Sequence, residues 1–174
     1  FLRGLGCYTD DVLKDKCLRG FVLRSPIAAG SFKIGSLKAA KTAPGVRLIL
    51  TASDIAHLNP LASWYKLKRP DGSLYPSRDI PILCDGHVRH VGDAIAFVVA
   101  DSLLQAQDAA ELIEIDFDSC EAIAVTGEAL SSEAPLVWSQ ADSNLAYIEN
   151  YGNRAKTDRA FAKANGRSPG GDIF

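Results

Sequence analysis

The clearest hydrophobic pattern in the chain is an unbroken apolar run from Ala94 to Ala100. A run this short and this rich in residues that favour β structure predicts a strand buried on both faces. A helix is expected to begin directly after this strand. Ser102 is a good N-cap residue, and Gln105, three positions later, can complete a capping box.

The next residues follow a helical period and then a strand period. The spacing predicts a helix from Ser102 to Ile113. Its buried face is expected to carry Leu103, Ala106, Ala110 and Ile113, and its solvent face Gln107, Asp108, Glu111 and Glu114. From Glu114 the period is two, with Ile115 and Phe117 on the opposite side from Asp116 and Asp118. The pattern therefore predicts strand, helix and strand within one short segment, with the helix packed across a sheet.

The first half of the chain predicts further strands and one short helix. Strands are expected from Leu18 to Leu23, Ser31 to Ile34, Val46 to Leu50 and Ile80 to Leu83, and a helix from Leu37 to Thr42. Pro26 stops the first strand and Pro44 limits the helix, because proline disfavours a ladder position and restricts the residue before it. Asp85-Gly86 predicts a hairpin-type turn, after which His87 is expected to continue into the long apolar strand.

Two stretches are expected to be irregular. Asn59 to Arg78 contains several prolines, the turn Pro70-Asp71-Gly72 and the aromatic residues Trp64, Tyr65 and Tyr75. It predicts a long excursion or lid, whose aromatic rings either line a ligand pocket or pack the loop. After Val125 the sequence mixes short apolar pieces with polar residues. A helix is expected from Ala155 to Ala164, and Gly166 to Gly171 has the composition of a linker.

Five stretches, taken in order, resemble one known enzyme family. The first is Gly4-Leu5-Gly6-Cys7-Tyr8-Thr9-Asp10-Asp11, similar to an opening G-x-G-x-Y-x-D-D, and the second is Phe21-Val22-Leu23-Arg24-Ser25-Pro26, a strand that runs into R-S-P. The third joins Ala43-Pro44-Gly45-Val46 with Thr51-Ala52-Ser53-Asp54-Ile55, and the fourth is Val88-Arg89-His90-Val91-Gly92, which matches V-R-x-V-G. The fifth is the strand, helix and strand between His87 and Ile123. Together they resemble the α/β-hammerhead domain of the molybdenum hydroxylases: xanthine dehydrogenase, aldehyde oxidase and the large subunit of carbon monoxide dehydrogenase.

The sequence departs from this family at two places. Ile27-Ala28-Ala29-Gly30 follows R-S-P where the family usually has His or another polar residue. Asp93-Ala94 follows Gly92 where the family commonly has Glu or Gln and then Pro. The fold implied by the resemblance is unaffected, but the subfamily, and with it the substrate, stays open.

The resemblance implies an α+β fold, an α/β-hammerhead with a mixed sheet and a few short helices. It implies a hammerhead domain at residues 1–125 and a connector at 126–174 toward a molybdenum-cofactor-binding domain. It also implies a parent oxidoreductase that hydroxylates aldehydes or heteroaromatics such as xanthine, or oxidises carbon monoxide, with oxygen from water. In such an enzyme the molybdopterin-type cofactor carries the chemistry, and iron–sulfur clusters and FAD of the wider complex take the electrons.

The family's cofactor loops and catalytic glutamate lie beyond the hammerhead domain, and no stretch of this chain matches them. The segment is therefore expected to be a scaffold that is inactive alone. Its expected partners are the downstream molybdenum-cofactor domains and the iron–sulfur and flavin domains or subunits. A chain without methionine that begins at Phe1 also favours a fragment of a longer protein.

Composition narrows the class further. A hydrophobic content of 47%, a charged content of 23% and a net charge of −2 are ordinary for a globular protein and give no footprint for nucleic acid or anionic membrane. No apolar run approaches the roughly 20 residues of a membrane span, and no leader pattern is visible. Cys7, Cys17, Cys84 and Cys120 lie far apart without a C-x-x-C pair, which argues against a zinc site and favours a reducing cytoplasm.

The candidate catalytic and metal-binding residues of the chain all have structural interpretations. On a strand, His87 and His90 would point to opposite faces, so hydrogen-bonded edge positions are expected and metal binding would need a bulge. His57 is expected to be a surface or hydrogen-bonded histidine. Gly4-x-Gly6 lacks the third glycine of a dinucleotide loop, which favours a turn. We assign no catalytic, cofactor-binding or metal-binding residue to this segment.

The remaining polar candidates also have structural interpretations. Asp10 and Asp11 are adjacent, so their side chains diverge, which favours solvated carboxylates over an acid/base pair. Arg24 is expected to hold one of these two carboxylates rather than a substrate.

Two other function classes stay open at this point. One is a carrier domain of the barrel-sandwich type. Such a domain needs a modified lysine at a hairpin tip, and the Asp15-Lys16 turn is not a convincing candidate for it. The other is a free-standing interaction module.

Overall fold

The computed structural model describes residues 2–4, 6–8, 17–62, 68–69, 71–75, 79–148 and 151–163. Its strands are β1 (Arg19–Arg24), β2 (Gly30–Ile34), β3 (Val46–Thr51), β4 (His87–Val88), β5 (Ala94–Ala100) and β6 (Ile115–Ser119). Its helices are α1 (Lys38–Thr42), α2 (Leu103–Glu111) and α3 (Arg154–Lys163), with 3-10 turns η2 (Ala52–Ile55) and η3 (Thr126–Glu128). The α+β class is confirmed, and most predicted elements agree with these bounds to within two residues.

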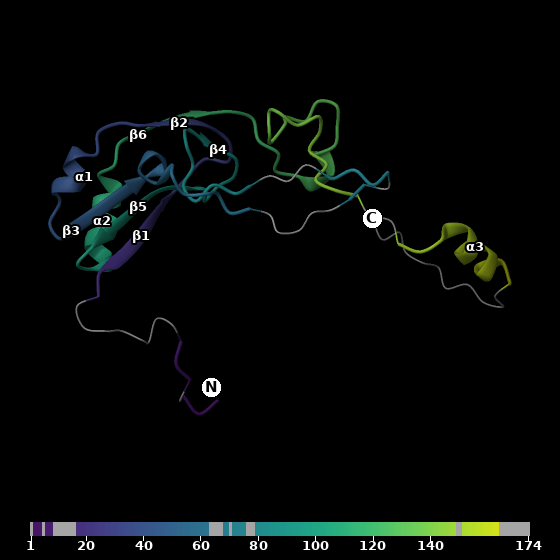
Figure 1. Ribbon diagram of the computed structural model, residues 1–174, viewed down its shortest axis with the longest axis horizontal. Coiled ribbons are helices and arrows are strands. Elements are labelled where there is room, and N and C mark those ends of the chain that lie inside the picture. The colour runs from purple at the N-terminus through teal and green to yellow at the C-terminus, as the bar shows by residue number, and fades with distance from the viewer. Residues whose placement is uncertain are drawn as a thin grey trace.

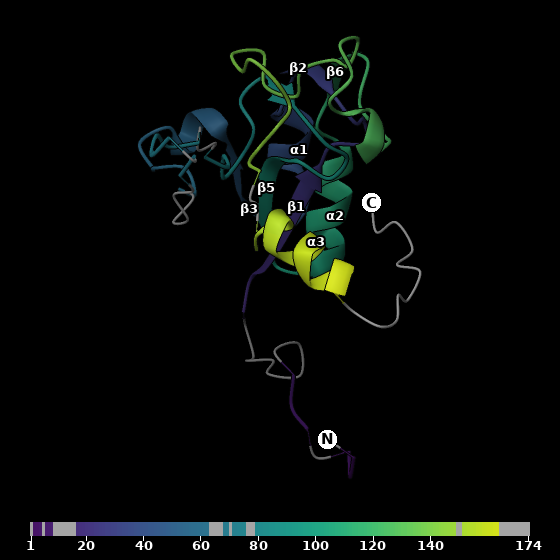
Figure 2. The ribbon, with the colours of Figure 1, turned by 90° about the vertical axis from the view of Figure 1, so that its right-hand side faces the viewer.

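The strands form two three-stranded sheets (Figure 1). In the first, which we call the β5 sheet, the order is β1-β5-β3, so β5 is the central strand, as predicted. In the second, the β2 sheet, the order is β4-β2-β6. The described pairings are all antiparallel, so where a mixed sheet was expected the strands form two separate antiparallel sheets. Figure 2 shows β2 and β6 together at one end of the molecule, beyond β1, β3 and β5.

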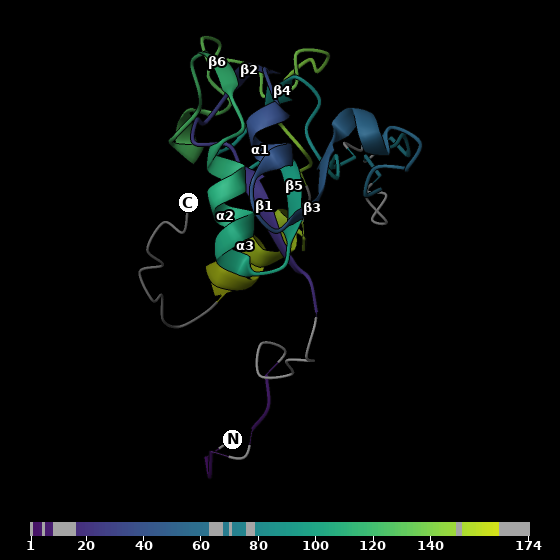
Figure 3. The same ribbon diagram turned by 90° about the vertical axis from the view of Figure 1, so that its left-hand side faces the viewer.

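Helices α1 and α2 lie side by side on one face of the β5 sheet (Figure 3). Ala106 and Ala109 of α2 and Ala96, Val98 and Ala100 of β5 have no exposed surface. Side chains this small let the helix backbone approach the strands closely, and the apolar surface removed from water stabilises the contact. The predicted packing of this helix across the sheet is confirmed.

The helix face is rotated slightly from the predicted one. Leu103 was expected to be buried but is 49% exposed, whereas Ala109, not predicted, is fully buried. Successive residues are separated by about 100° around a helix, so Ala106, Ala109 and Ala110 form one stripe and Leu103 lies at its edge. The predicted cap at Ser102 is confirmed, because its hydroxyl oxygen accepts the backbone N–H of Gln105 at 3.3 Å. The Gln105 side chain returns to the Ser102 hydroxyl rather than to its backbone.

Two strand predictions around residues 80–93 are wrong. Residues 80–83 form no strand; Ile80 makes only an isolated bridge to Leu61. His87 does not continue into β5 but lies in β4, which pairs with β2 in the other sheet. The reason is a turn after β4, closed by Gly92 with a φ of 93° and by the Asp93 carboxylate, which accepts the backbone N–H of Arg89 at 2.6 Å. The hydrogen bonds of this turn therefore separate β4 from β5, although the sequence pattern predicts one continuous strand.

A second, smaller core lies between the sheets. It contains Phe32, Cys84, Val88 and Ile95, with Phe117 packed against it and the Phe32 and Phe117 ring centroids 6.1 Å apart. Ile95 belongs to this cluster, whereas Ala96 and Val98 belong to the cluster under α2. The prediction that β5 is buried on both faces is therefore confirmed for the face that carries Ala96 and Val98, whereas on the second face Ile95 is buried and Phe97 and Val99 are only partly buried.

The chain after β6 is less regular. Among its described residues, the 3-10 turn η3 and the helix α3 are the regular elements, and α3 agrees with the helix predicted at 155–164. Every residue of α3 is exposed, and the helix lies apart from both sheets (Figure 1). None of the helices in the described part of the chain combines the length and apolar content that a membrane crossing requires.

Candidate functional site

The histidines singled out in the sequence do not form a group of metal ligands in the described part of the chain. His57 is exposed just after η2, His87 is partly buried in β4, and His90 lies in the turn after it. The Nδ1 atom of His90 is 3.0 Å from Oδ1 of Asp93, so its partner is a carboxylate rather than a second histidine. Within the described ranges no group of three or more His, Cys, Asp or Glu residues could hold a metal ion.

The other candidates from the sequence that lie among the described residues have structural roles. Arg24 donates from Nη1 to the carbonyl oxygen of Gly92 at 2.8 Å, which ties β1 to the turn before β5. Gly4 lies in a bend with a φ of 70°, as the turn interpretation requires. The Tyr75 hydroxyl donates to the carbonyl oxygen of Ile148 at 3.2 Å and accepts its N–H at 3.1 Å. Asp10, Asp11, Lys16, Trp64, Tyr65, Pro70 and residues 166–171 lie outside the described residues.

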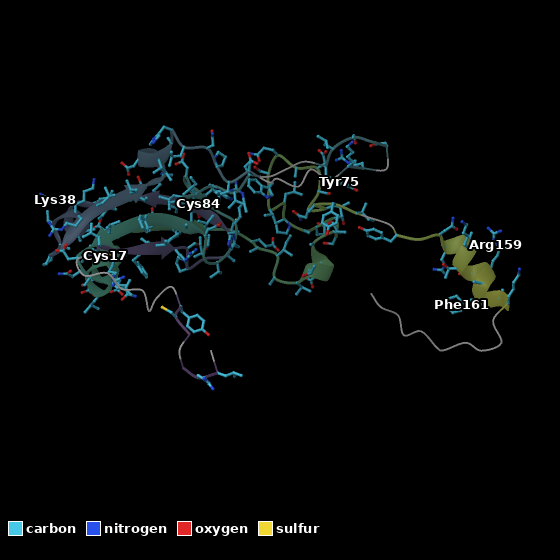
Figure 4. The ribbon with its side chains drawn as sticks, turned by 60° about the horizontal axis from the view of Figure 1, so that its bottom comes forward. Cys17, Lys38, Tyr75, Cys84, Arg159 and Phe161 are labelled. Carbon is cyan, nitrogen blue, oxygen red and sulfur yellow. The ribbon has the colours of Figure 1, made fainter. Side chains whose placement is uncertain are left out.

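The buried cysteine, Cys84, is not an activated thiol. Cys84 is only 3% exposed and lies among the packed strands (Figure 4). Burial, together with the nearby Asp93 carboxylate, raises the pKa of Cys84 to about 11. The thiol is therefore protonated at neutral pH and behaves as a small apolar side chain. Cys7, Cys17 and Cys120 are free and exposed.

Asp93 is the residue that sequence reasoning missed. Its Oδ2 accepts the backbone N–H groups of Arg89 and His90 at 2.6 and 3.2 Å, and its side chain is only 13% exposed. One signal could have revealed it: an Asp directly after a glycine that closes a turn, where a carboxylate can accept the free N–H groups of the turn. The position is also one of those at which the sequence departs from the family pattern.

The turn that Asp93 holds together forms one wall of a cavity of about 380 Å³, which we call the Arg89 pocket. It is lined by Ala28, Ala29, His87, Arg89, His90, Val91, Cys120, Glu121, Ala122, Ile123, Pro135, Leu136 and Val137. The guanidinium carbon of Arg89 lies 4.0 Å from the centre of the Trp138 ring. This contact joins two segments that are far apart in the sequence.

The opposite face of the β5 sheet from α1 and α2 carries a shallow apolar groove of about 510 Å³, the β5 groove. It is lined by Val22, Arg24, Leu50, Ile55, Leu58, Leu61, Ile80, Pro81, Ile82, Leu83, His90, Gly92, Asp93, Ala94 and Phe97. Leu61 and Ile80 in this groove are each 61% exposed. A contiguous apolar surface of this kind is typical of a contact face for another protein segment.

The middle of this face is built by Phe97 and Gly20. A Cβ atom added to Gly20 would lie 2.5 Å from Cζ of Phe97, so the aromatic ring covers the glycine. Gly20 is therefore the residue that leaves room for the tip of the Phe97 ring over the neighbouring strand β1. The ring forms part of the apolar lining of the groove.

The chain is similar to a known enzyme family over most of its length. Residues 3–121 match the family model described as "Aldehyde oxidase and xanthine dehydrogenase, a/b hammerhead domain". The carbon monoxide dehydrogenase large chain of Hydrogenophaga pseudoflava is 28% identical over 176 residues, covering 94% of this chain. The xanthine dehydrogenase molybdenum-binding subunit of Escherichia coli O157:H7 is 36% identical over 132 residues, covering 75% of this chain.

Solved structures give the same result. The crystal structure of quinoline 2-oxidoreductase from Pseudomonas putida 86 matches with a TM-score of 0.67 and 31% identity, over 76% of this chain and 16% of that one. Aldehyde oxidoreductase from Desulfovibrio gigas matches with a TM-score of 0.69 and 26% identity, and the match covers 91% of this chain and 17% of that one. The chain spans about one fifth of the length of the curated relatives it matches, 21% for the Hydrogenophaga protein and 17% for the Escherichia protein.

Proposed function

Because this chain belongs to the aldehyde oxidase and xanthine dehydrogenase a/b hammerhead family, we propose that it is the scaffold segment of a molybdenum-cofactor oxidoreductase subunit. In this proposal the parent protein hydroxylates aldehydes or heteroaromatics, or oxidises carbon monoxide, with oxygen from water. The segment itself carries no reacting group. It supplies a packed surface on which the cofactor-binding part of the subunit folds and docks.

The observation that carries this proposal is the asymmetry of the β5 sheet. One face is closed by α1 and α2 and has a fully buried alanine and valine core. The other face is the apolar β5 groove, with Leu61 and Ile80 largely exposed. Exposed apolar surface of this extent is unfavourable in water, and docking of further polypeptide would remove it.

In this proposal the segment does not itself hold the molybdopterin-type cofactor. Two observations support this assignment: the described residues contain no cluster of metal ligands, and the buried thiol Cys84 is protonated. A pyranopterin with its phosphate also needs several converging backbone N–H groups or cations, whereas the lining of the Arg89 pocket contains a single arginine and one acidic residue, Glu121. In the proposed parent, the molybdenum site and the iron–sulfur and flavin groups are therefore supplied by other domains or subunits.

The proposed division of the chain follows the same logic. Residues 1–125 form the hammerhead domain, and residues 126–174 connect it to the cofactor-binding part. The exposed position of α3 supports this division, because a helix without a packing surface of its own is best explained by a contact elsewhere in the parent. A cytoplasmic location is part of the proposal, since the free cysteines suit a reducing compartment.

The test uses the parent subunit with Leu61 and Ile80 both replaced by Ser. Both side chains are largely exposed in the isolated segment, so the folding of the segment itself should change little. The parent should lose thermal stability and bound molybdenum, because the docking face becomes polar. The matched control replaces Leu104 and Leu130, which are 67% and 64% exposed outside the groove. Equal losses in both variants, or none in the groove variant, would contradict the proposal.

A second measurement addresses the catalytic part of the proposal. The isolated segment should be colourless, free of molybdenum and inactive toward aldehydes, purines and carbon monoxide. Deletion of the segment from the parent should abolish assembly of active enzyme. Stoichiometric molybdenum in the isolated segment, or full activity after the deletion, would overturn the scaffold function.

A further inference from the structure

Residues 126–148, which we call the strap, are held in shape by bonds of their own. The backbone hydrogen bonds between described residues of the strap are local ones that stay within it or join it to the residue before it. The side-chain oxygen of Asn144 accepts the Val137 N–H at 2.9 Å. Its amide nitrogen donates to the carbonyl oxygens of Ala129 and Pro135 at 3.0 and 2.9 Å. The shape of the strap therefore depends little on the two sheets.

The connection between β6 and the strap has the character of a hinge. Residues 120–125 belong to no helix or strand, and all of them except the partly buried Ile123 are exposed. The Cys120 N–H still binds the carbonyl oxygen of Ala29 at 3.0 Å, so the chain leaves the β2 sheet directly after this residue. An exposed segment without regular structure can change its backbone dihedrals at small cost, which allows the body beyond it to move as a unit.

The first contact that holds the strap in place is the stacking of Trp138 on Arg89. The guanidinium carbon lies 4.0 Å from the ring centre, a cation–π contact that favours docking. The same contact is opposed by desolvation, because Nε of Arg89 is shielded from water and has no hydrogen-bond partner among the described residues. The ring covers one face of the guanidinium group, so withdrawal of the strap would return this nitrogen to water. Docking is therefore favoured less than the stacking alone would suggest.

The second contact lies at the far end of the strap, on the excursion between β3 and β4. The Tyr75 hydroxyl donates to the carbonyl oxygen of Ile148 and accepts its N–H, at 3.2 and 3.1 Å. The guanidinium carbon of Arg69 lies 5.0 Å from the centre of the Tyr75 ring and steadies the phenol. Both hydrogen bonds are exposed to solvent, where water competes for the same groups, so this contact also stabilises the docked strap only modestly.

We propose that the strap docks and undocks as one unit, with the Arg89–Trp138 and Tyr75–Ile148 contacts forming and breaking together. This inference concerns the present chain alone and goes beyond the proposed function. In the docked state, residues 135–137 close one wall of the Arg89 pocket. In the undocked state, the pocket is open and Nε of Arg89 is hydrated. The free part of the proposed connector then begins after Ile148 when the strap is docked, and at the hinge when it is not.

The test breaks each contact and observes the other one. Trp138→Ala should speed hydrogen exchange of the Ile148 amide by about tenfold, because the strap spends more time undocked. Tyr75→Phe should increase quenching of Trp138 fluorescence by acrylamide, measured in the Trp64→Phe background where Trp138 is the one remaining tryptophan. The Val137 amide should keep its protection in both variants, since its partner Asn144 moves with the strap.

The matched control is Leu130→Ala, which removes a 64% exposed apolar side chain from the same strap and should leave both signals unchanged. An unchanged Ile148 exchange rate in Trp138→Ala, or an equal increase in the control, would overturn the proposal. If Trp138→Ala also speeds exchange in β5, Tyr75→Phe decides alone, because it removes one exposed hydroxyl and leaves the sheets intact. Unchanged Trp138 quenching in Tyr75→Phe would then show that the two contacts are independent and that the strap is not one unit.

Discussion

The imidazole of His90 faces the carboxylate of Asp93, with Nδ1 and Oδ1 3.0 Å apart, across the turn that separates β4 from β5. The second carboxylate oxygen accepts the backbone N–H groups of Arg89 and His90. A single carboxylate therefore organises the turn that sends β4 into one sheet and β5 into the other. The same turn carries Arg89 to its place over Trp138.

Asp93→Ala should destabilise the segment by about 2 kcal/mol, because two backbone N–H groups lose a charged acceptor in a poorly solvated position. Unfolding in urea, followed by circular dichroism, measures the change. Asp93→Asn should cost less, since the amide oxygen can still accept one N–H group. The control is Asp116→Ala on the exposed side of β6. A loss of the same size in the control would show that the effect is not due to the turn.

Asp54 should give the protein a measurable acid sensitivity. Its Oδ2 accepts the backbone N–H of Thr51 at 2.8 Å and the Thr51 hydroxyl at 2.7 Å, and these bonds hold the pKa of Asp54 below its usual value. Because the folded-state pKa is lowered, this stabilisation is present above the unfolded-state pKa, about 4, and is lost as pH falls through the folded-state pKa.

The measurement is the free energy of unfolding of wild type and Asp54→Asn between pH 2 and pH 7. The two proteins should differ by a constant amount above about pH 5 and converge below about pH 4. Because Asp54 is exposed, the difference should be small. A difference that grows as the pH falls would have the wrong sign and would refute this role of Asp54.

The buried face of α2 can be checked with one matched pair of substitutions. Ala106→Asp places a charge in the fully buried contact with β5 and should cost roughly 3 kcal/mol or more. Leu103→Asp, at a position that the sequence pattern predicts to be buried but that is 49% exposed, should cost much less. Melting temperatures of the two variants decide between the predicted and the observed helix face. Equal destabilisation would favour the predicted face.

The thiols should separate into two kinetic classes. Cys7, Cys17 and Cys120 are exposed and should react quickly with a disulfide reagent at pH 8, whereas Cys84 should react only as the protein unfolds. Burial and a pKa of about 11 keep the Cys84 thiol protonated and inaccessible. Cys84→Ala should remove the slow phase alone. A slow phase that persists in this variant would place the protected thiol elsewhere.

Much of the fold could be predicted because its elements are set by local patterns. The apolar run of β5, the Ser102 cap and the alternation of β6 each lie within a few neighbouring residues, and each is confirmed. The errors arise where distant or turn-level contacts decide. Two-residue β4 is defined by its pairing with β2, which no periodicity reveals, and residues 80–83 are apolar because they line the β5 groove, not because they form a strand.

The candidate site was much less accessible from sequence. The histidines attracted attention by residue type, but the pocket depends on Arg89 and Trp138, which lie on different segments and show no common motif. The loop that brings Trp138 into place depends on the three hydrogen bonds of Asn144, a residue without any distinguishing context. The contact between Arg89 and Trp138 forms only in the folded chain. The sequence shows that both residues are present, but it does not show that they lie close together.

Helix α3 should be the least protected regular element of the isolated segment. It has ten residues, all exposed, and an isolated helix of this length is marginal in water. Asn153 accepts the Lys156 N–H at 3.0 Å, and Arg154 pairs with Asp158, but a surface pair of this kind contributes little. Its amides should exchange with deuterium orders of magnitude faster than those of β5, with α2 as a packed helix for comparison.

In the parent subunit the half-exposed Phe161 should be covered and α3 protected, because the proposed connector would then have its docking surface. Protection of α3 equal to that of β5 in the isolated segment would instead make α3 part of the hammerhead domain, and would move the proposed boundary beyond it.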